Sequence, residues 1–243
     1  MVARSLRALA ALLVPVLVTT CSSSNDDAGV LRVGILLPLS GPQDLKARQT
    51  LEWVRENVEV TGGVAGHKLE LVYADTAQEP VAVAAKRFAE DPSIVAVVGP
   101  ETSTGLFEIG PYFLRANKLI VSPSAQSSDL SRAFAGRRYI WRTVEPDLAQ
   151  MQVLLLVASE RGKKTVALYT PDSSEGTGFF DGFGFYATEL GLVPTSLVRY
   201  VATSTECEDG VREAVSGSPE VLFVVPTNSE VPSTLVRMDR AGA

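Results

Sequence analysis

The chain has 243 residues, of which 46% are hydrophobic and 21% are charged, and this length and composition exclude a disordered segment and a disulfide-stabilised peptide. Its 22 basic and 28 acidic residues give a net charge of −6, without the cluster of Lys and Arg that nucleic-acid binding requires. The single histidine, His67, and the two cysteines, Cys21 and Cys207, are too few for a zinc site and for most histidine-dependent catalysis. We therefore expect no metal, no cofactor and no nucleic-acid partner.

The first 20 residues have the pattern of a secretory signal peptide. Two arginines precede an apolar run over residues 8–18, and small residues follow it. The run is shorter than the roughly 20 residues of a membrane-spanning helix, and Pro15 interrupts it. We expect residues 1–20 to direct export and not to span the membrane.

Cys21 directly follows these small residues and precedes the polar stretch SSSNDDAG. This arrangement resembles the lipobox of bacterial lipoproteins, in which the cysteine is acylated and becomes the first residue of the mature protein. The resemblance implies that Cys21 is the lipidation site and provides a lipid anchor to a membrane, with residues 21–30 as a flexible tether. An ordinary signal-peptidase site with an incidental cysteine is the alternative. Acylation of Cys21 leaves Cys207 without a partner for an intramolecular disulfide.

Beyond the tether, short predicted strands alternate with predicted helices. Runs rich in Val, Ile and Leu predict buried parallel strands over residues 31–39, 68–75, 94–99, 118–123 and 138–144. Apolar residues at helical spacing predict helices between them, over residues 45–60, 77–91 and 104–117. This alternation predicts a parallel sheet covered by helices on both faces.

A second series of the same kind follows. It comprises predicted strands over residues 165–172, 197–203 and 220–227 and predicted helices over residues 147–161, 177–190, 207–216 and 230–241. The predicted fold class is therefore α/β, with two Rossmann-like parallel-sheet lobes. We place the first lobe at residues 31–145 and the second at residues 146–243, with a hinge between Val144 and Pro146 and the ligand cleft between the lobes.

Four segments carry a family resemblance: LRVGILLPLSGP, TGGVAGHKLELVYAD, IVAVVGPETSTG and KLIVSPSAQ. In this order and spacing they resemble the type I periplasmic solute-binding proteins, specifically the leucine/isoleucine/valine-binding kind that serves ABC importers. The likeness extends over residues 31–243. It implies a protein that is not an enzyme, whose lobes close on a small amino-acid-like ligand, with an ABC permease as partner and a location in the periplasm or at the cell surface.

The loop GPETSTG, residues 99–105, follows the third predicted strand and precedes a helix. Ligands of open parallel sheets collect at the carboxyl ends of the strands, where a helix N-terminus attracts an anion. The hydroxyl of Ser103 or Thr104 can add a donor to the backbone N–H groups, and Ser103 stands where the family's carboxylate-binding serine stands. The alternative is that Thr102 and these two residues only cap the helix.

The loop SPSAQSS, residues 122–128, follows the fourth predicted strand. It matches the family's second ligand loop, which implies that Ser124, Ala125 and Gln126 meet the ammonium and carboxylate of the ligand. Gln126 stands where the family has a small hydroxyl residue, a departure that favours a ligand other than an unmodified aliphatic amino acid. Neither loop contains an arginine, so N–H groups and hydroxyls form the predicted anion site. A plain surface loop is the alternative.

In the second lobe, polar residues stand where family members often present aromatic ones. They are Asp172, Ser174, Thr227 and Asn228. As ligand-binding residues they predict a more polar ligand, and the alternative is that they form turns and helix caps. The segment after SGP, residues 40–42, is also shorter than in the family, which predicts a reshaped specificity end of the cleft.

The chain ends after LVRMDRAGA, whereas the family's second lobe continues further. We therefore expect an incomplete second lobe with exposed apolar faces, as in a fragment or a truncated, non-binding product. A ligand-sensing domain for a receptor partner is the other candidate function. An exported hydrolase is less favoured because the G-x-S-x-G motif is absent, and a nucleotide-binding enzyme because the phosphate-loop motifs are absent.

Overall fold

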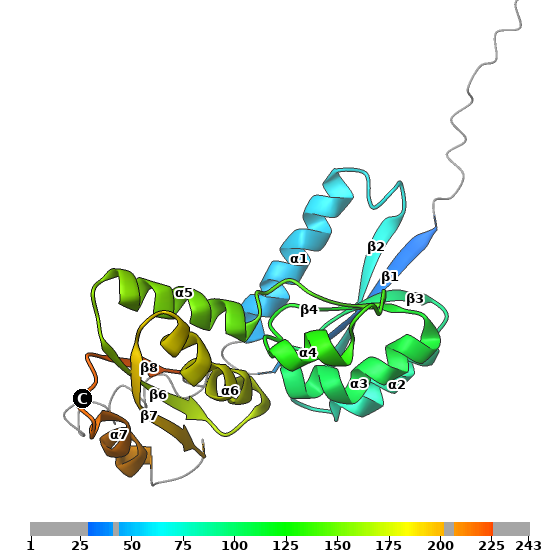
Figure 1. Cartoon of the computed structure of the whole chain (residues 1–243). Coiled ribbons are helices and arrows are strands. Elements are labelled where there is room, and N and C mark those ends of the chain that lie inside the picture. The colour runs from blue at the N-terminus through cyan, green and yellow to red at the C-terminus, as the bar shows by residue number, and fades with distance from the viewer. Residues whose placement is uncertain (1–28, 41–43, 202–206, 226–243) are drawn as a thin grey trace, which may run out of the picture.

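The computed structural model describes residues 29–40, 44–201 and 207–225. The strands of its first part are β1 (Val30–Leu37), β2 (Lys68–Asp75), β3 (Ile94–Val98), β4 (Leu119–Ser122) and β5 (Ile140–Arg142). The helices between and beside them are α1 (Asp44–Val60), α2 (Val81–Glu90), α3 (Ser103–Ala116) and α4 (Ser128–Ala133). All five strands are parallel and form one sheet in the order β2-β1-β3-β4-β5 (Figure 1).

The second part repeats this arrangement. Its strands are β6 (Thr165–Pro171), β7 (Val193–Tyr200) and β8 (Val221–Val224), and its helices are α5 (Asp147–Glu160), α6 (Ser174–Glu189) and α7 (Cys207–Val215). The strands are parallel in the order β7-β6-β8. The two sheets confirm the predicted α/β class. The division of the lobes at residue 145 stays a prediction.

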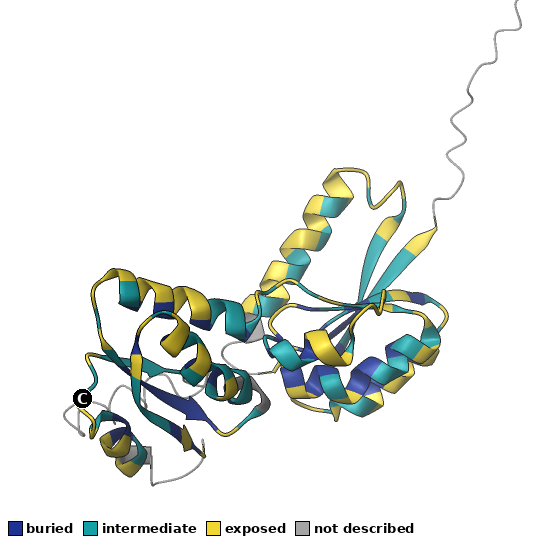
Figure 2. Ribbon diagram, viewed as in Figure 1, coloured by how far each residue is buried: buried dark blue, intermediate teal, exposed yellow. Residues whose placement is uncertain are grey.

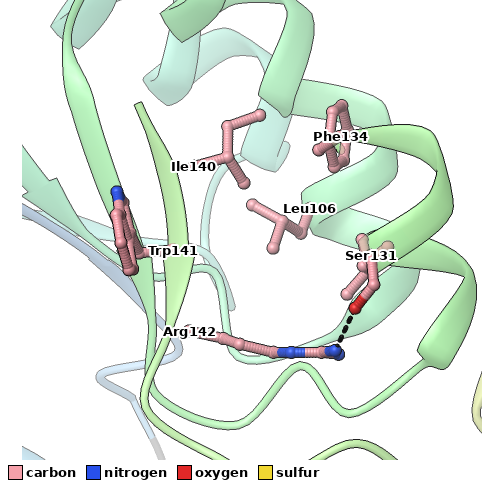
Figure 3. Close-up of a pocket in the computed structure, with 7 residues that line it drawn as sticks. Leu106, Ser131, Phe134, Ile140, Trp141 and Arg142 are labelled. Atoms are coloured by element: carbon pink, nitrogen blue, oxygen red, sulfur yellow. Dashed lines mark hydrogen bonds between the residues drawn. The ribbon is translucent and has the colours of Figure 1, made fainter. Parts of the chain in front are cut away.

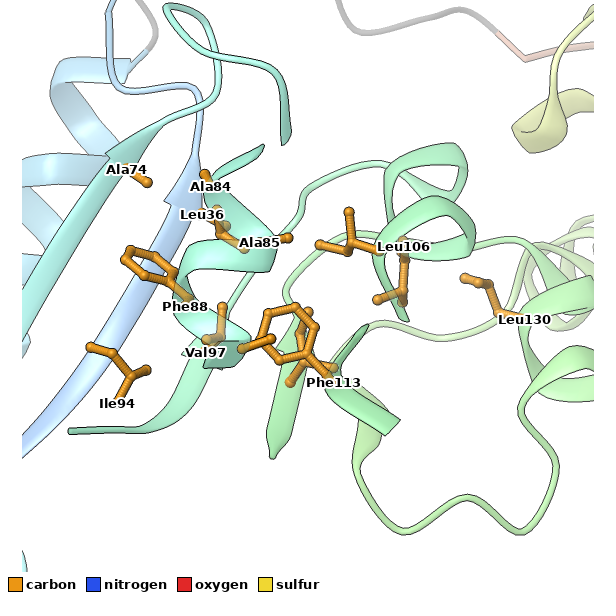
Figure 4. Packing of buried hydrophobic residues seen from close by; sticks show 14 residues of the cluster. Leu36, Ala74, Ala84, Ala85, Phe88, Ile94, Val97, Leu106, Phe113 and Leu130 are labelled. Carbon is orange, nitrogen blue, oxygen red and sulfur yellow. The ribbon is translucent and has the colours of Figure 1, made fainter. Parts of the chain in front are cut away.

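The first sheet is buried on both faces because neighbouring residues of β1 point to opposite sides. Leu36 belongs to one apolar cluster with Phe88 of α2 and Phe113 of α3 (Figure 4). Ile35 belongs to another, with Leu51 of α1. Burial on both faces explains why this strand is a continuous apolar run and not an alternating one.

The second sheet is built in the same way. Leu168 of β6 shares a cluster with Leu155 of α5 and Phe183 of α6. The next residue, Tyr169, shares a different cluster with Val211 of α7. Helices α5 and α6 therefore cover one face of this sheet and α7 covers the other.

Helix α5 is apolar on its outer side as well. Met151 and Leu155 are buried, whereas Val153 is 60% exposed and Leu154 is 51% exposed, and Figure 2 shows exposed residues along this helix. A helix that is apolar on all sides is typical of one that is covered on two sides. The described residues cover α5 on one side only.

Strand β7 begins earlier than the predicted strand over residues 197–203. It starts at Val193, which pairs with Thr165 of β6. Pro194, which obscured this start in the sequence, is tolerated because β7 lies at an edge of the described sheet. The predicted helix over residues 230–241 lies outside the described residues.

Helices α6 and α4 also differ from expectation. Helix α6 begins at Ser174 and not near residue 177, because the hydroxyl of Ser173 accepts a hydrogen bond from the N–H of Gly176 (3.2 Å) and caps the helix. Helix α4 has no counterpart among the predicted helices. It has six residues, of which only Leu130 is buried, so its sequence has no apolar periodicity to predict it.

Candidate functional site

The two predicted ligand loops lie side by side at the carboxyl edge of the first sheet. Residues 99–102 follow β3 and residues 123–127 follow β4, and these strands are adjacent and parallel. The chain winds from β1 to β2 on one side and from β3 to β4 on the other, so the topological switch point falls between β1 and β3. In open parallel sheets, ligands bind at this point.

Hydrogen bonds that each use a serine hydroxyl join the two loops. They run from Ser122 Oγ to the carbonyl of Pro100 (2.5 Å), from Ser124 Oγ to the carbonyl of Glu101 (2.7 Å), and from the N–H of Ser127 to Ser103 Oγ (3.0 Å). Ser103 and Ser122 are fully buried, so water does not compete for their bonds. The serines of the second loop therefore fix it against the first.

Gly99 lets the first loop pass close to β1. Its φ is +114°, and a Cβ at this position would lie 2.1 Å from the carbonyl oxygen of Leu36. Only glycine meets both conditions. The N–H of Gly99 also donates to the carbonyl of Val121 (2.8 Å), so the start of the loop is held between β1 and β4.

The predicted residues Ser103 and Thr104 stand in the first turn of α3. The cap of this helix is Thr102, whose hydroxyl accepts a hydrogen bond from the N–H of Gly105 (3.1 Å). The capping alternative therefore holds for Thr102, whereas the buried hydroxyl of Ser103 bonds the other loop. Thr104 is exposed. Ligand binding by Ser103 and Thr104 stays a prediction.

The three residues predicted from the second loop differ in exposure. Ser124 is exposed, Ala125 is fully buried in the apolar cluster below the loop, and Gln126 is half-buried. The carbonyl of Gln126 accepts hydrogen bonds from Arg142 Nη1 (3.2 Å) and from the N–H of Asp147 (3.0 Å). Neither of these neighbours was predicted from the sequence.

Arg142, the last residue of β5, lies against the second loop. Its Nη1 donates to the carbonyls of Gln126 and Ser127 (2.8 Å), and its Nη2 donates to Ser131 Oγ (2.5 Å; Figure 3). Within the described part of the chain, no carboxylate forms an ion pair with this guanidinium. The signal that could have found Arg142 is its place in the sheet, because β5 ends at the same edge as β3 and β4.

Asp147, the first residue of α5, holds the other side of the same loop. Its fully buried carboxylate accepts through Oδ1 from the N–H (3.0 Å) and the hydroxyl of Ser128, and from the N–H of Leu148 (2.7 Å). Oδ2 has no hydrogen-bond partner among the described residues. It lies against Gly178 of α6, where a Cβ would approach it to 2.2 Å. Asp147 therefore links the loop after β4 to α6.

Asp75, the last residue of β2, fixes the segment that follows β1. Its carboxylate accepts hydrogen bonds from the N–H of Leu39 (2.7 Å), the hydroxyl of Ser40 and the N–H of Ala77 (3.0 Å). The bond from Ser40, followed by the backbone bonds, holds the pKa of Asp75 below its ordinary value. Of the shortened segment predicted at the specificity end, residues 41–43 lie outside the described residues, and α1 begins directly after them at Asp44.

In the second lobe, Asp172 follows β6 directly and is exposed. It pairs with Arg199 of β7 (3.1 Å), which also reaches Asp181 (3.4 Å) and lies over the ring of Phe180 (4.1 Å to its centroid). No hydrogen bond or ion pair between described residues joins this group to the first-lobe loops. The carboxylate predicted to face the ligand is thus paired within its own lobe.

The remaining predicted residues are less fully described. Ser174 is the first residue of α6, and the structure does not describe its side chain. Thr227, Asn228 and Cys21 lie outside the described residues. Their predicted roles stay predictions.

A pocket of about 100 Å³ opens beside Arg142 (Figure 3). Its lining comprises Leu106, Leu130, Ser131, Phe134, Ile140, Trp141 and Arg142. It is smaller than the roughly 300 Å³ at which small-molecule sites begin, and none of the predicted ligand-binding residues lines it. This pocket is therefore not the predicted ligand site.

Metal-binding clusters and membrane-spanning helices are both absent from the described ranges. These ranges contain no group of three or more His, Cys, Asp or Glu side chains arranged to hold a metal ion. No helix within them has the length and apolarity needed to cross a membrane.

Comparison with known proteins gives the following matches. A family model described as periplasmic binding protein matches residues 30–243. The chain is 27% identical over 206 residues to the chemotactic signal transduction system substrate-binding protein BasB of Halobacterium salinarum, over 79% of this chain and 49% of that protein. It is 28% identical over 158 residues to the Leu/Ile/Val-binding protein BraC3 of Rhizobium johnstonii, over 63% of this chain and 42% of that protein.

A solved structure gives a similar result. The ABC transporter substrate-binding protein from Desulfitobacterium hafniense, in complex with Leu, superimposes with a TM-score of 0.75 at 25% identity, over 87% of this chain and 63% of that chain. The chain spans about half the length of the curated relatives it matches.

Proposed function

Because the chain belongs to the type I periplasmic binding proteins of the leucine/isoleucine/valine-binding family, we propose that it captures a small polar or amino-acid-like carboxylate between two lobes and delivers it to an ABC permease. Membership of this family confirms the resemblance drawn from the four sequence segments. The carboxylate binds where the loops after β3 and β4 meet the N-terminus of α3. Ser103 donates to it, and Thr104 and the loop of Ser124, Ala125 and Gln126 complete the site.

The strongest support is the junction of the two loops at that helix N-terminus. Helix α3 has 14 residues, and a helix of this length presents N–H donors and a partial positive charge at its first turn. The hydrogen bond from Ser127 to Ser103 brings the second loop to the same turn. Arg142 adds a cation that has no carboxylate partner in the described part of the chain. These groups together favour an anion.

The neighbouring side chains favour a polar ligand. Gln126 offers an amide that both donates and accepts. Asp172 and Ser174 follow β6 at the carboxyl edge of the second sheet, and we propose that they contact the ligand together with Thr227 and Asn228, which come after β8 in the sequence. Because the carboxylate of Asp172 is paired with Arg199, a ligand must either displace Arg199 from it or bind to both side chains.

We further propose that the protein acts outside the cytoplasm, in the periplasm or at the cell surface. Residues 1–20 direct its export, and acylation of Cys21 anchors it to a membrane through the tether at residues 21–30. The support is the order of charged, apolar and small residues before Cys21 and the periplasmic family to which the chain belongs.

Ligand sensing for a receptor is the second candidate. It is favoured by the similarity to BasB, whose name assigns it to chemotactic signal transduction. The two functions share one ligand site and differ in the protein that recognises the loaded form. Deletion of the gene separates them, because an importer component is needed for uptake of the labelled ligand, whereas a sensor is needed only for the response to it.

Calorimetric titration with L-leucine and a panel of other amino acids and organic acids tests the site. A charge-assisted hydrogen bond contributes about 1.5–3 kcal/mol, so Ser103→Ala should weaken binding about tenfold to a hundredfold. Ser122→Ala is the matched control, because Ser122 is also fully buried and also joins the loops but stands outside the helix. Equal losses in both variants would contradict a direct contact with Ser103. If the chain binds no compound of the panel, the proposal that it captures a ligand is contradicted.

A further inference from the structure

Building on the proposed function, we infer that Arg142 is a positioning residue that makes the site select an anionic ligand. It acts on Ser103 through the peptide group between Gln126 and Ser127. Arg142 is not among the residues proposed to touch the ligand, and its contacts explain both how the second loop is held and why a negative charge is favoured beside it.

The geometry of one peptide group carries this role. In a trans peptide, the carbonyl and the N–H point in opposite directions. The carbonyl of Gln126 accepts from Arg142 Nη1 (3.2 Å), and the N–H of the same peptide, which belongs to Ser127, donates to Ser103 Oγ (3.0 Å). The guanidinium and the serine hydroxyl therefore lie at opposite ends of one polar group. A cation at the carbonyl polarises the peptide and strengthens its N–H as a donor.

Arg142 Nη1 bonds a second peptide group, the one between Ser127 and Ser128, and this group forms a second branch of the hydrogen-bond network. The carbonyl of Ser127 also accepts from Arg142 Nη1 (2.8 Å), and the N–H of Ser128 donates to Asp147 Oδ1 (3.0 Å). This branch ends on a buried carboxylate, whereas the branch through Gln126 ends on a neutral hydroxyl. The two branches together hold the loop in one orientation. Only the branch through Gln126 leads from the positive charge of Arg142 to Ser103, the residue proposed to donate to the ligand.

The contacts of Arg142 require its forked shape. Nη1 serves two carbonyls while Nη2 donates to Ser131 Oγ (2.5 Å; Figure 3). A lysine has a single nitrogen on a flexible stem and cannot hold three such acceptors in fixed positions. Arg142→Lys therefore keeps the charge and loses the fork, and Arg142→Gln loses both. These two variants separate electrostatic selection from loop positioning.

Binding of matched acids and neutral amides measures the selection. The probes are L-leucine and L-leucinamide, with further acid and amide pairs from the panel. The path from Arg142 Nη1 to Ser103 Oγ is at most roughly 9 Å, and a carboxylate bonded to that hydroxyl lies about 3 Å further away. Loss of the charge should therefore weaken binding of the acid about twofold to tenfold. The amide should lose much less. Arg132→Gln, which removes a nearby exposed arginine paired with Asp129, should leave both affinities unchanged.

Hydrogen exchange measures the positioning without a ligand. Amide exchange at Ser127 should accelerate in both Arg142 variants and stay unchanged in Arg132→Gln. Unchanged exchange at Ser127 in Arg142→Gln overturns the inference, as do equal losses of acid and amide binding or an effect of Arg132→Gln equal to that of Arg142→Gln. If the wild-type chain binds no acid of the panel, the proposed function and the ligand selection fail together, and the exchange data still decide whether Arg142 positions the loop.

Discussion

Replacing Gly178 with alanine tests the buried contact between Asp147 and α6. Gly178 lies inside a helix, where alanine is favoured over glycine by about 1 kcal/mol. A Cβ at this position would nevertheless lie 2.2 Å from Oδ2 of Asp147 and 2.7 Å from its Cγ. The carboxylate cannot turn away at low cost, because Oδ1 accepts hydrogen bonds from Ser128 and Leu148. The steric clash therefore predicts that Gly178→Ala lowers the free energy of unfolding, whereas helix propensity predicts that it raises it.

The size of the clash decides between them. Overpacking of a buried site costs about 1–3 kcal/mol, so after the gain in propensity Gly178→Ala should lower the free energy of unfolding by about 1 kcal/mol. Gly184 in the same helix is the matched control, because a Cβ there would have no neighbour within 4 Å. Gly184→Ala should raise the free energy of unfolding by about 0.5–1 kcal/mol. The two variants should then differ in melting temperature by roughly 3–8 °C.

Urea unfolding and thermal unfolding, both followed by circular dichroism, measure the two variants against the wild type. If Gly178→Ala proves as stable as Gly184→Ala, Asp147 does not lie against α6 and the reasoning is wrong. A double variant gives a further check. In an Asp147→Ala background the obstructing carboxylate is absent, so Gly178→Ala should lose most of its cost, and the two substitutions should be non-additive.

Asp75 should make stability depend on acid pH. Its folded-state pKa is lowered, first by the bond from Ser40, so its contribution is present above the unfolded-state pKa of about 4 and is lost as the pH falls below that value. Urea midpoints of the wild type should fall more steeply with acid than those of Asp75→Asn, and equal slopes would argue against this assignment. Cys21→Ala should move the protein from the membrane fraction to the soluble fraction, as read by fractionation and by mass spectrometry of the N-terminus; unchanged membrane association would refute lipidation.

The strands could be predicted from the sequence because both faces of each sheet are covered. A continuous apolar run such as the one around Ile35 and Leu36 is typical of a strand that helices cover on both sides. The two loops could be predicted to meet because the carboxyl ends of parallel strands share one edge. The roles of Ser103 and of Ser124 to Gln126 came from the family resemblance, and the hydrogen bonds that join their loops add a structural reason for the serines.

The contacts that Arg142 and Asp147 make could not be predicted in the same way. Arg142 lies in the stretch RYIWRTV, which indicates only a strand, and two of its acceptors are main-chain carbonyls that every residue carries. Asp147 resembles an ordinary acidic residue at a helix start, and its burial depends on α4 and α6 packing around it. Contacts between a side chain and the main chain of a distant segment leave no spacing pattern in one sequence.

The way Gln126 is held has a consequence for divergence among relatives. In the described contacts it takes part through its main-chain oxygen alone, so the hydrogen bonds that hold the loop here do not depend on the side chain at position 126. Substitution of Gln126, one of the proposed ligand residues, should therefore change ligand preference at little cost in the free energy of folding. Serines 103, 122 and 127 have no such freedom, because their hydroxyls form hydrogen bonds. Those of Ser103 and Ser122 hold the loops together, and that of Ser127 caps α4. Among relatives, new ligand specificities should thus arise at position 126 more readily than at the three serines.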